Sequence, residues 1–145
     1  MANSLPIARV RTIKLLEFKY DRAFKAAEGT PIQFNVQVKH RIPAMTTRLE
    51  VLVVITYTEE EPTRTEPLLL AECLTIYLLD NVITEIDEDS GKETISLPEE
   101  LMSRLFAESI AHSRALLAAQ TAGTTFGGTH VEIRSDFPTE NKFEL

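Results

Sequence analysis

Hydrophobic and polar residues alternate along four segments in the first part of the chain. The clearest alternation is in residues 31–40, PIQFNVQVKH, where every second side chain is apolar. This pattern predicts a strand with one buried face and one face in water. Residues 7–20, 47–58 and 68–79 are also rich in β-branched and aromatic residues, which favours strands. Because the connections are short and no helix intervenes, we predict an antiparallel meander of these four strands.

Residues 96–120, SLPEELMSRLFAESIAHSRALLAAQ, have the pattern of one long amphipathic helix. Ser96 is the expected N-cap, Glu99 completes a capping box, and Pro98 fits the first turn. The apolar stripe comprises Leu101, Met102, Leu105, Phe106, Ile110, Leu116 and Leu117, with two small serines, Ser109 and Ser113, inside it. Small residues there would let the helix approach a sheet closely. We therefore expect an α+β fold: a four-stranded antiparallel meander sheet followed by one long helix and an extended C-terminal tail.

The strands predicted at 47–58 and 68–79 are apolar on both faces at their centres. A helix is about 10 Å wide and covers only two strands, about 5 Å apart, on one side of a sheet. Each large apolar side chain left in water forfeits roughly 1.5–3 kcal/mol. We therefore expect the second face to be covered by another copy of the chain or to serve partners. The alternative is that the connector at 21–30 and the C-terminal tail fold across that face.

The composition is that of an ordinary globular protein with one domain, residues 1–145, and a net charge of −7 at pH 7. This charge disfavours nucleic acid and anionic lipid as partners. No segment is apolar over the roughly 18 residues of a membrane helix, and the N-terminus lacks a hydrophobic signal core, so we expect no membrane insertion. The single cysteine, Cys73, lies in an apolar run. We interpret it as a buried structural thiol, which fits a cytoplasmic location.

The segment AGTTFGG, residues 122–128, has the composition of a phosphate-binding loop, but it follows the C-terminus of the predicted helix. Phosphates bind at helix N-termini, where free N–H groups point outward. Gly123 is therefore predicted to end the helix in the left-handed conformation. The three histidines, His40, His112 and His130, lack the spacing of a metal site, and the helix serines lack a nucleophile elbow. We therefore expect no metal, no cofactor and no catalytic residue.

Three segments and the order of the elements resemble the SecB protein-export chaperone family. TIKLLEFKY (12–20) is similar to the first strand of the family, and EVLVVITYTEEEPTRTEPLLLAE (50–72) to its third and fourth strands with their hairpin. SRALLAAQTAGTTFGGTHVEIRSDFPTENKF (113–143) is similar to the segment where the helix ends in Gly-Thr and the chain continues through a proline and an aromatic residue. The resemblance covers nearly the whole chain.

The resemblance implies a homotetramer, a dimer of dimers in which helices are sandwiched between sheets. It also implies long hydrophobic grooves that hold unfolded clients, without a cofactor or catalysis. The export chaperones use acidic residues, including those on the first strand, to dock the SecA translocase motor. At the positions that match on the first strand this chain has Leu15 and Lys19, with Glu17 nearby, and Glu72 matches on the fourth strand. Glu17 and Glu72 are therefore the candidates for docking a partner.

From these features we expect a molecular chaperone that oligomerises and holds unfolded or aggregation-prone polypeptides for export or partner assembly. Its expected partners are unfolded or partly folded client proteins and a translocase motor or an antitoxin. The alternative is a non-catalytic adaptor on the same fold that binds one specific partner, such as a toxin–antitoxin pair. The residues expected to line the hydrophobic groove are Phe18, Tyr20, Phe34, Tyr57 and Tyr77. For each of these aromatic residues the alternative is a place in the core.

Overall fold

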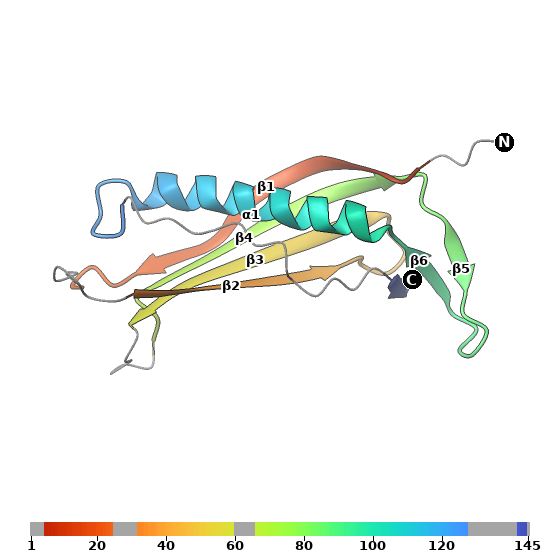
Figure 1. Ribbon diagram of the computed structural model, residues 1–145, viewed down its shortest axis with the longest axis horizontal. Coiled ribbons are helices and arrows are strands. Elements are labelled where there is room, and N and C mark those ends of the chain that lie inside the picture. The colour runs from red at the N-terminus through yellow and green to blue at the C-terminus, as the bar shows by residue number, and fades with distance from the viewer. Residues whose placement is uncertain (1–4, 25–31, 60–65, 128–141, 145) are drawn as a thin grey trace.

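The computed structural model describes residues 5–24, 32–59, 66–127 and 142–144, and shows a four-stranded sheet with one long helix along one face (Figure 1). The strands of the main sheet are β1 (Ile7–Tyr20), β2 (Ile32–Arg41), β3 (Arg48–Glu59) and β4 (Leu69–Asp80). The helix α1 spans Glu99–Thr121, and a second sheet contains β5 (Thr84–Ile86), β6 (Glu93–Ser96) and β7 (Lys142–Glu144). The α+β fold class predicted from the sequence is confirmed.

The main sheet is antiparallel throughout and has the strand order β1-β4-β3-β2. Strands β2, β3 and β4 form the expected meander, whereas β1 pairs with β4 and not with its neighbour in sequence. This is a Greek-key order, which puts β1 and β2 at opposite edges of the sheet. The sequence does not reveal this crossover, because alternation identifies strands but not their partners.

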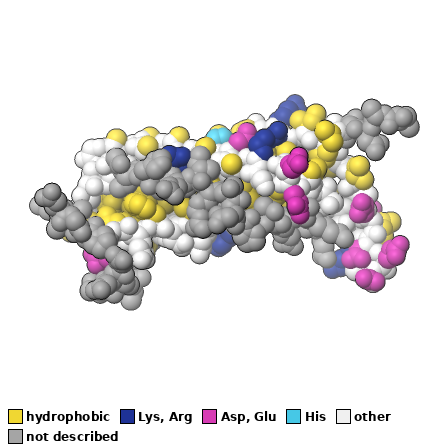
Figure 2. Space-filling model, in the orientation of Figure 1, with side chains coloured by type: hydrophobic (Ala, Val, Ile, Leu, Met, Phe, Trp, Pro, Cys, Tyr) yellow, Lys and Arg dark blue, Asp and Glu magenta, His cyan; other side chains and the backbone are white. Residues whose placement is uncertain are grey.

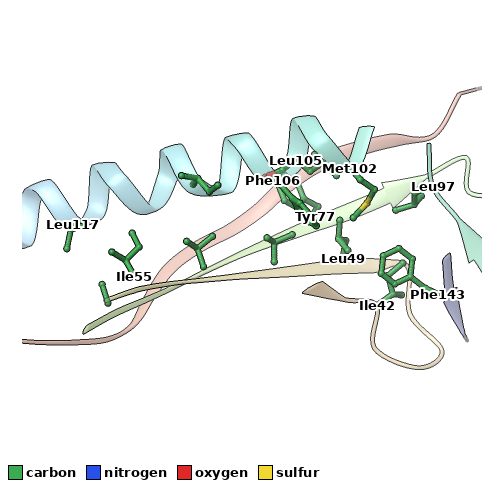
Figure 3. Packing of buried hydrophobic residues seen from close by; sticks show 14 of the residues in the cluster. Ile42, Leu49, Ile55, Tyr77, Leu97, Met102, Leu105, Phe106, Leu117 and Phe143 are labelled. Carbon is green, nitrogen blue, oxygen red and sulfur yellow. The ribbon is translucent and has the colours of Figure 1, made fainter. Parts of the chain in front are cut away.

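The core lies between α1 and one face of the sheet. Every second residue of β3 and β4 is buried on this face, and the residues between them are partly exposed on the other. Met102, Leu105 and Phe106 of α1 point toward the sheet, with Tyr77 of β4 beneath them (Figure 3). The helix packs on β4, β3 and β1. One helix therefore covers one face of the sheet, as the sequence predicts, and the opposite face is called the open face below.

Strand β1 contains two irregularities that explain its imperfect alternation. The register with β4 shifts between Val10 and Thr12 and again between Leu15 and Glu17, as β-bulges do. Each shift reverses the side on which the following residues point. As a result the helix face receives even-numbered and odd-numbered residues of β1. Those that lie opposite helix-face residues of β4 include Val10, Leu15, Phe18 and Tyr20.

A seam of polar contacts joins α1 to β4 within the apolar core. The hydroxyl oxygen of Tyr77 lies 3.1 Å from Ser109 Oγ and donates to a helix carbonyl at 3.1 Å. Thr75 Oγ1 lies 3.1 Å from His112 Nδ1. Ser109 and Ser113 are almost completely buried against the sheet. The two small serines thus allow the close approach that the sequence predicts, and His112 lies at the margin of the core.

The segment after β4 forms an antiparallel hairpin of β5 and β6. Its turn is closed by Asp87, whose carbonyl accepts the Gly91 amide at 2.7 Å and whose carboxylate accepts the Asp89 amide at 3.1 Å. Acidic side chains gather at this end of the molecule (Figure 2). The C-terminal strand β7 pairs with β6 and buries Phe143 in the core. Residues 128–141 of the predicted C-terminal tail lie outside the described residues.

The two ends of α1 differ in how well the sequence predicts them. The predicted capping box is wrong: Pro98 is the N-cap, and no side chain caps the helix. Ser96 is instead the last residue of β6, where it pairs with Lys142, so it is too far from the helix to cap it. At the other end Gly123 has φ +79, the left-handed conformation predicted for it. The segment therefore ends a helix, as its position implied.

Candidate polypeptide-binding surfaces

Aromatic side chains cluster on the helix face, at the end of the sheet where α1 terminates. Ring centroids of Tyr20 and Tyr57 lie 6.2 Å and 5.8 Å from that of Phe126, which follows the helix. Phe34 of β2 packs edge-on against Tyr57 with centroids 4.6 Å apart. Phe18 stacks obliquely on Tyr20 at 5.6 Å. Three strands and the loop after the helix thus build one aromatic platform, and Figure 2 shows hydrophobic side chains at the surface of this end.

The five predicted groove residues divide by exposure. Phe34 is 43% exposed, and Phe18 and Tyr20 are partly exposed. Tyr57 and Tyr77 have no exposed surface, so in this structure both belong to the core. Tyr77 also lies apart from the other four, in the polar seam under α1. Of the five, Phe18, Tyr20 and Phe34 are therefore the ones that a polypeptide could contact without displacing the helix.

Two members of the platform, Phe24 and Phe126, were not predicted from the sequence. Their rings stack with centroids 5.8 Å apart and an interplanar angle of 12°. Phe126 is buried, and it is held by a turn in which the Thr124 hydroxyl oxygen accepts its amide at 3.2 Å. The sequence does contain a signal for Phe126: it is a phenylalanine in a Gly-Thr turn directly after a helix, where a large apolar side chain gains by packing against the core. Its partners could not be known without the fold.

Glu17 and Glu72, the predicted docking residues, are direct cross-strand partners of β1 and β4 on the open face. Like charges opposite each other destabilise a sheet. Lys19 offsets part of this repulsion, because its Nζ lies 3.6 Å from Glu17 Oε1. Strand β4 is interior, so Glu72 reaches water through the uncovered face and not at a sheet edge. The two carboxylates therefore form one acidic spot next to an apolar surface.

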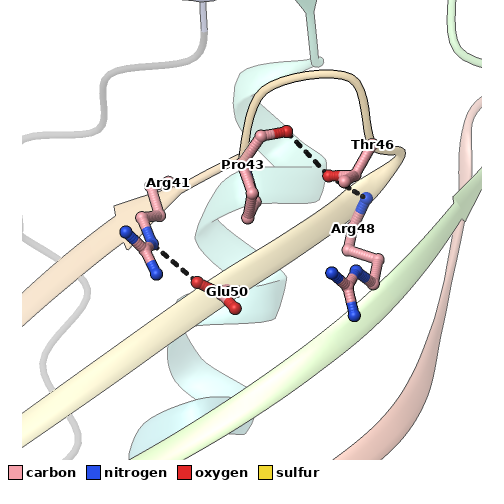
Figure 4. A network of polar contacts seen from close by, with 5 residues as sticks. All are labelled: Arg41, Pro43, Thr46, Arg48 and Glu50. Atoms are coloured by element: carbon pink, nitrogen blue, oxygen red, sulfur yellow. Dashed lines mark hydrogen bonds and ion pairs between the residues drawn. The ribbon is translucent and has the colours of Figure 1, made fainter.

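The rest of the open face is a shallow hollow. Leu52 and Leu74 are cross-strand partners on its floor, and Leu16 adds an exposed side chain beside them. The hollow has a volume of 320 Å³ and is rimmed by Lys39, Arg41 and Glu50, among others. The Nε of Arg41 donates to Glu50 Oε1 at 2.6 Å, and both side chains lie on the side of the sheet away from α1 (Figure 4). The open face thus combines leucines with charged edges.

Two buried groups in the seam have altered proton affinities. Burial raises the pKa of the Cys73 thiol, and its contact with the Ser113 hydroxyl opposes part of that rise. Cys73 is 2% exposed, which confirms the predicted structural thiol. Burial also raises the pKa of Tyr77 to about 12, against the effect of its hydrogen bond with Ser109. A thiol that resists ionisation is a poor nucleophile.

The described part of the chain contains no group of three His, Cys, Asp or Glu side chains placed to hold a metal ion. None of its helices is long and apolar enough to cross a membrane.

Four antiparallel strands in the order β1-β4-β3-β2, with one long helix on one face, define the SecB-like α+β fold. Among solved structures, the chain is similar to the Mycobacterium tuberculosis Rv1957 SecB-like chaperone in complex with a ChAD peptide from the Rv1956 HigA1 antitoxin. The TM-score is 0.53 and the sequence identity 16%, over 88% of this chain and 87% of that chain. No protein-family model and no curated protein sequence matches the chain. The similarity therefore establishes the fold.

Proposed function

We propose that this protein is a cytoplasmic chaperone that self-associates and holds unfolded or aggregation-prone polypeptides. The observation that carries the proposal is the aromatic platform on a SecB-like fold, with Phe34 43% exposed and Phe18 and Tyr20 beside it. Exposed aromatic groups of this kind bind apolar side chains without requiring a particular sequence. Each apolar side chain of a client that becomes buried contributes roughly 1.5–3 kcal/mol.

Self-association is proposed from a second set of exposed side chains, on β1. Ile7, Val10, Ile13 and Leu16 are between 41% and 49% exposed along this edge strand. Of these, Val10 and Ile13 lie on the helix face, opposite Tyr77 and Thr75 of β4, and exposed apolar neighbours of this kind are typical of an interface. A homotetramer is the assembly that the sequence resemblance implies, and it would join several aromatic platforms into a longer surface. Multiple weak contacts along one client then act together.

The test is suppression of aggregation of a chemically denatured client, followed by light scattering. The wild-type protein should suppress aggregation at near-stoichiometric concentration. Phe34→Ser should weaken suppression several-fold, because it removes the most exposed ring of the platform. The matched control is Gln33→Ser, which changes a neighbouring side chain on the open face. Equal loss of activity in both variants, or no suppression by the wild type, would refute the proposal.

A second candidate is an adaptor that holds one specific partner. The complex of the similar Rv1957 chaperone with a peptide from an antitoxin supports it, since the same fold there binds a segment of another protein. For this chain the expected signature is recovery of a single protein in a fixed ratio from cell extract. A spectrum of unrelated, partly folded proteins would favour the general chaperone instead.

A further inference from the structure

The open face has a regular arrangement of charged side chains around its leucines. The proposed binding of clients at the aromatic platform does not involve these side chains. One row runs straight across the four strands, with Leu52 and Leu74 at its centre, and Lys14 and Lys39 opposite them on the two edge strands. Both lysine side chains are exposed. The row therefore has an apolar floor with one cation at each end.

Of the two adjacent rows, one contains the acidic pair Glu17 and Glu72, and the other contains Glu50 beside Arg41. A cationic row lies one step further along the sheet. Arg9 and Arg48 lie opposite Leu78, and Arg41 lies opposite Glu50, which is opposite Ile76. Arg9 pairs with Asp80 at 2.9 Å and Arg41 with Glu50 at 2.6 Å. Within the described residues, the side chains of Lys14, Lys39 and Arg48 form no ion pair. The lysine row thus presents positive charge without an ion-pair partner, next to an acidic row, although the whole chain has a net charge of −7.

The spacing of the two lysines defines the shape of a complementary ligand. Three strand separations put the edge strands about 14 Å apart. In an extended segment, residues i and i+4 are about 13 Å apart and point to the same side, with i+2 between them. Carboxylates at i and i+4 would reach Lys14 and Lys39 while an apolar residue at i+2 meets the leucine floor.

We propose that the open face is a second docking surface, which binds an acidic segment of a partner protein with the pattern Glu/Asp-x-Leu-x-Glu/Asp. The apolar floor supplies burial and the lysines supply orientation and selectivity for negative charge. The net charge of the chain does not prevent this, because charges beyond about 8 Å are largely screened at physiological ionic strength. The surface lies on the opposite side of the sheet from the aromatic platform, so the two could be occupied together.

The competing occupant is a second copy of this chain, through its own acidic hairpin of β5 and β6. The hairpin exposes Ile83 and Ile86 beside its carboxylates, so its chemistry also fits the hollow. A contact between two different surfaces of the same chain is head-to-tail and gives a ring or an open filament, not the two-fold contacts of the dimer of dimers that the resemblance implies. A separate acidic partner is therefore the occupant that we infer.

The test uses fluorescence anisotropy of a labelled peptide with two Glu-x-Leu-x-Glu repeats, in which x is serine. The wild-type protein should bind it, and more weakly as salt is raised. The double substitution Lys14→Glu and Lys39→Glu should weaken binding about tenfold, since two favourable ion pairs become repulsive. The control is Arg22→Glu with Arg104→Glu, which has the same change in net charge away from the lysine row and should bind within about twofold of wild type, because Arg22 lies over Tyr20 of the helix face and Arg104 is exposed on α1.

Three outcomes would overturn the proposal. One is equal binding of a peptide in which lysine replaces glutamate, and another is unchanged binding by the double variant. The third is a fall in native mass in the double variant without loss of peptide binding, which would identify a second copy as the occupant. The double substitution should leave suppression of client aggregation unaffected. Failure of the docking proposal would therefore show in peptide binding, and failure of the proposed chaperone function would show in the aggregation assay.

Discussion

At the scale of single residues, the polar groups between α1 and β4 have the clearest physical role. The Tyr77 hydroxyl is fully buried, yet it is satisfied by Ser109 and by a helix carbonyl. An unsatisfied hydroxyl at this depth would cost about 1–3 kcal/mol, so the contacts fix how the helix sits on the sheet. Thr75 and His112 add a second such contact one turn further along the helix.

The raised pKa of Tyr77 predicts a loss of stability at high pH. Its pKa is about 12 in the folded protein and 10 in the unfolded chain, so above pH 10 the folded state retains a proton that the unfolded state loses. The free energy of unfolding should therefore be unaffected below pH 10 and should fall by about 1.4 kcal/mol per pH unit from there to pH 12. Tyr77→Phe should lack this contribution and should cost about 1 kcal/mol at pH 7. Urea unfolding of both proteins from pH 7 to 11.5 measures the difference, and parallel curves would contradict it.

Substitutions at Gly123 distinguish two reasons for a glycine there: its backbone conformation and the space around it. A Cβ at this position would meet no atom within 4 Å, but φ is +79. Gly123→Ala should therefore destabilise the fold by about 1–2 kcal/mol through the backbone alone, and Gly123→Val by more. The control is Ala122→Val, at a position with φ −55 that any residue can adopt. Thermal unfolding should rank the variants in this order; a Gly123→Val variant as stable as wild type would refute the argument.

At the scale of elements, the docking of α1 depends on small side chains. Ser109 and Ser113 are 0% and 1% exposed, and they bring the helix close to β4. A larger residue at either position has no volume available, because Tyr77 and Cys73 lie opposite. The two serines interrupt the apolar stripe of the helix because only small side chains fit between α1 and β4 at these positions.

Ser113→Leu should therefore destabilise the protein even though it raises hydrophobicity. Overpacking of a core costs about 1–3 kcal/mol, since side chains and backbone must move apart. Ser103→Leu is the matched control, because Ser103 is an exposed serine of the same helix. Urea unfolding midpoints should shift downward for Ser113→Leu only. A neutral or stabilising effect of Ser113→Leu would mean that the helix is not held close to the sheet.

At the scale of the whole molecule, the sheet divides the chain into two surfaces of different chemistry. The helix face carries the aromatic platform, and the open face carries leucines among charged residues of both signs. Strand β1 borders both, with exposed aliphatic residues on an edge that its bulges and basic residues protect from further strand pairing. Association through β1 would therefore use side chains more than backbone.

The substitution of Val10 and Ile13 by Asp should lower the native mass. These side chains are 47% and 41% exposed on the helix face of β1, where charge would oppose an apolar contact between copies. Light scattering should show wild type at a multiple of the chain mass, four being the proposed value, and the double variant at a lower one. Thr12→Asp, which faces the other side, should keep the wild-type mass. A wild-type monomer would contradict the proposed assembly.

The sequence by itself determined the elements and the imbalance between them. Alternation in residues 31–40 and two-faced apolar strands require a sheet, and one amphipathic helix can cover only one side of it. These are local properties that follow from the periods of strand and helix. Gly123 and Cys73 were likewise predictable, because a helix stop and an apolar neighbourhood are visible along the chain.

Only the tertiary structure decided which residues meet. Contacts between distant segments pair β1 with β4 and create the two bulges of β1. They also make Ser96 a residue of β6 instead of the helix cap that the sequence predicts. The same contacts buried Tyr57 and Tyr77, gathered the other aromatic residues around Phe126, and aligned two lysines across a leucine floor. Periodicity assigns a side chain to a face, but its neighbours on that face are fixed by strand order and register, and these depend on the free energy of the whole fold.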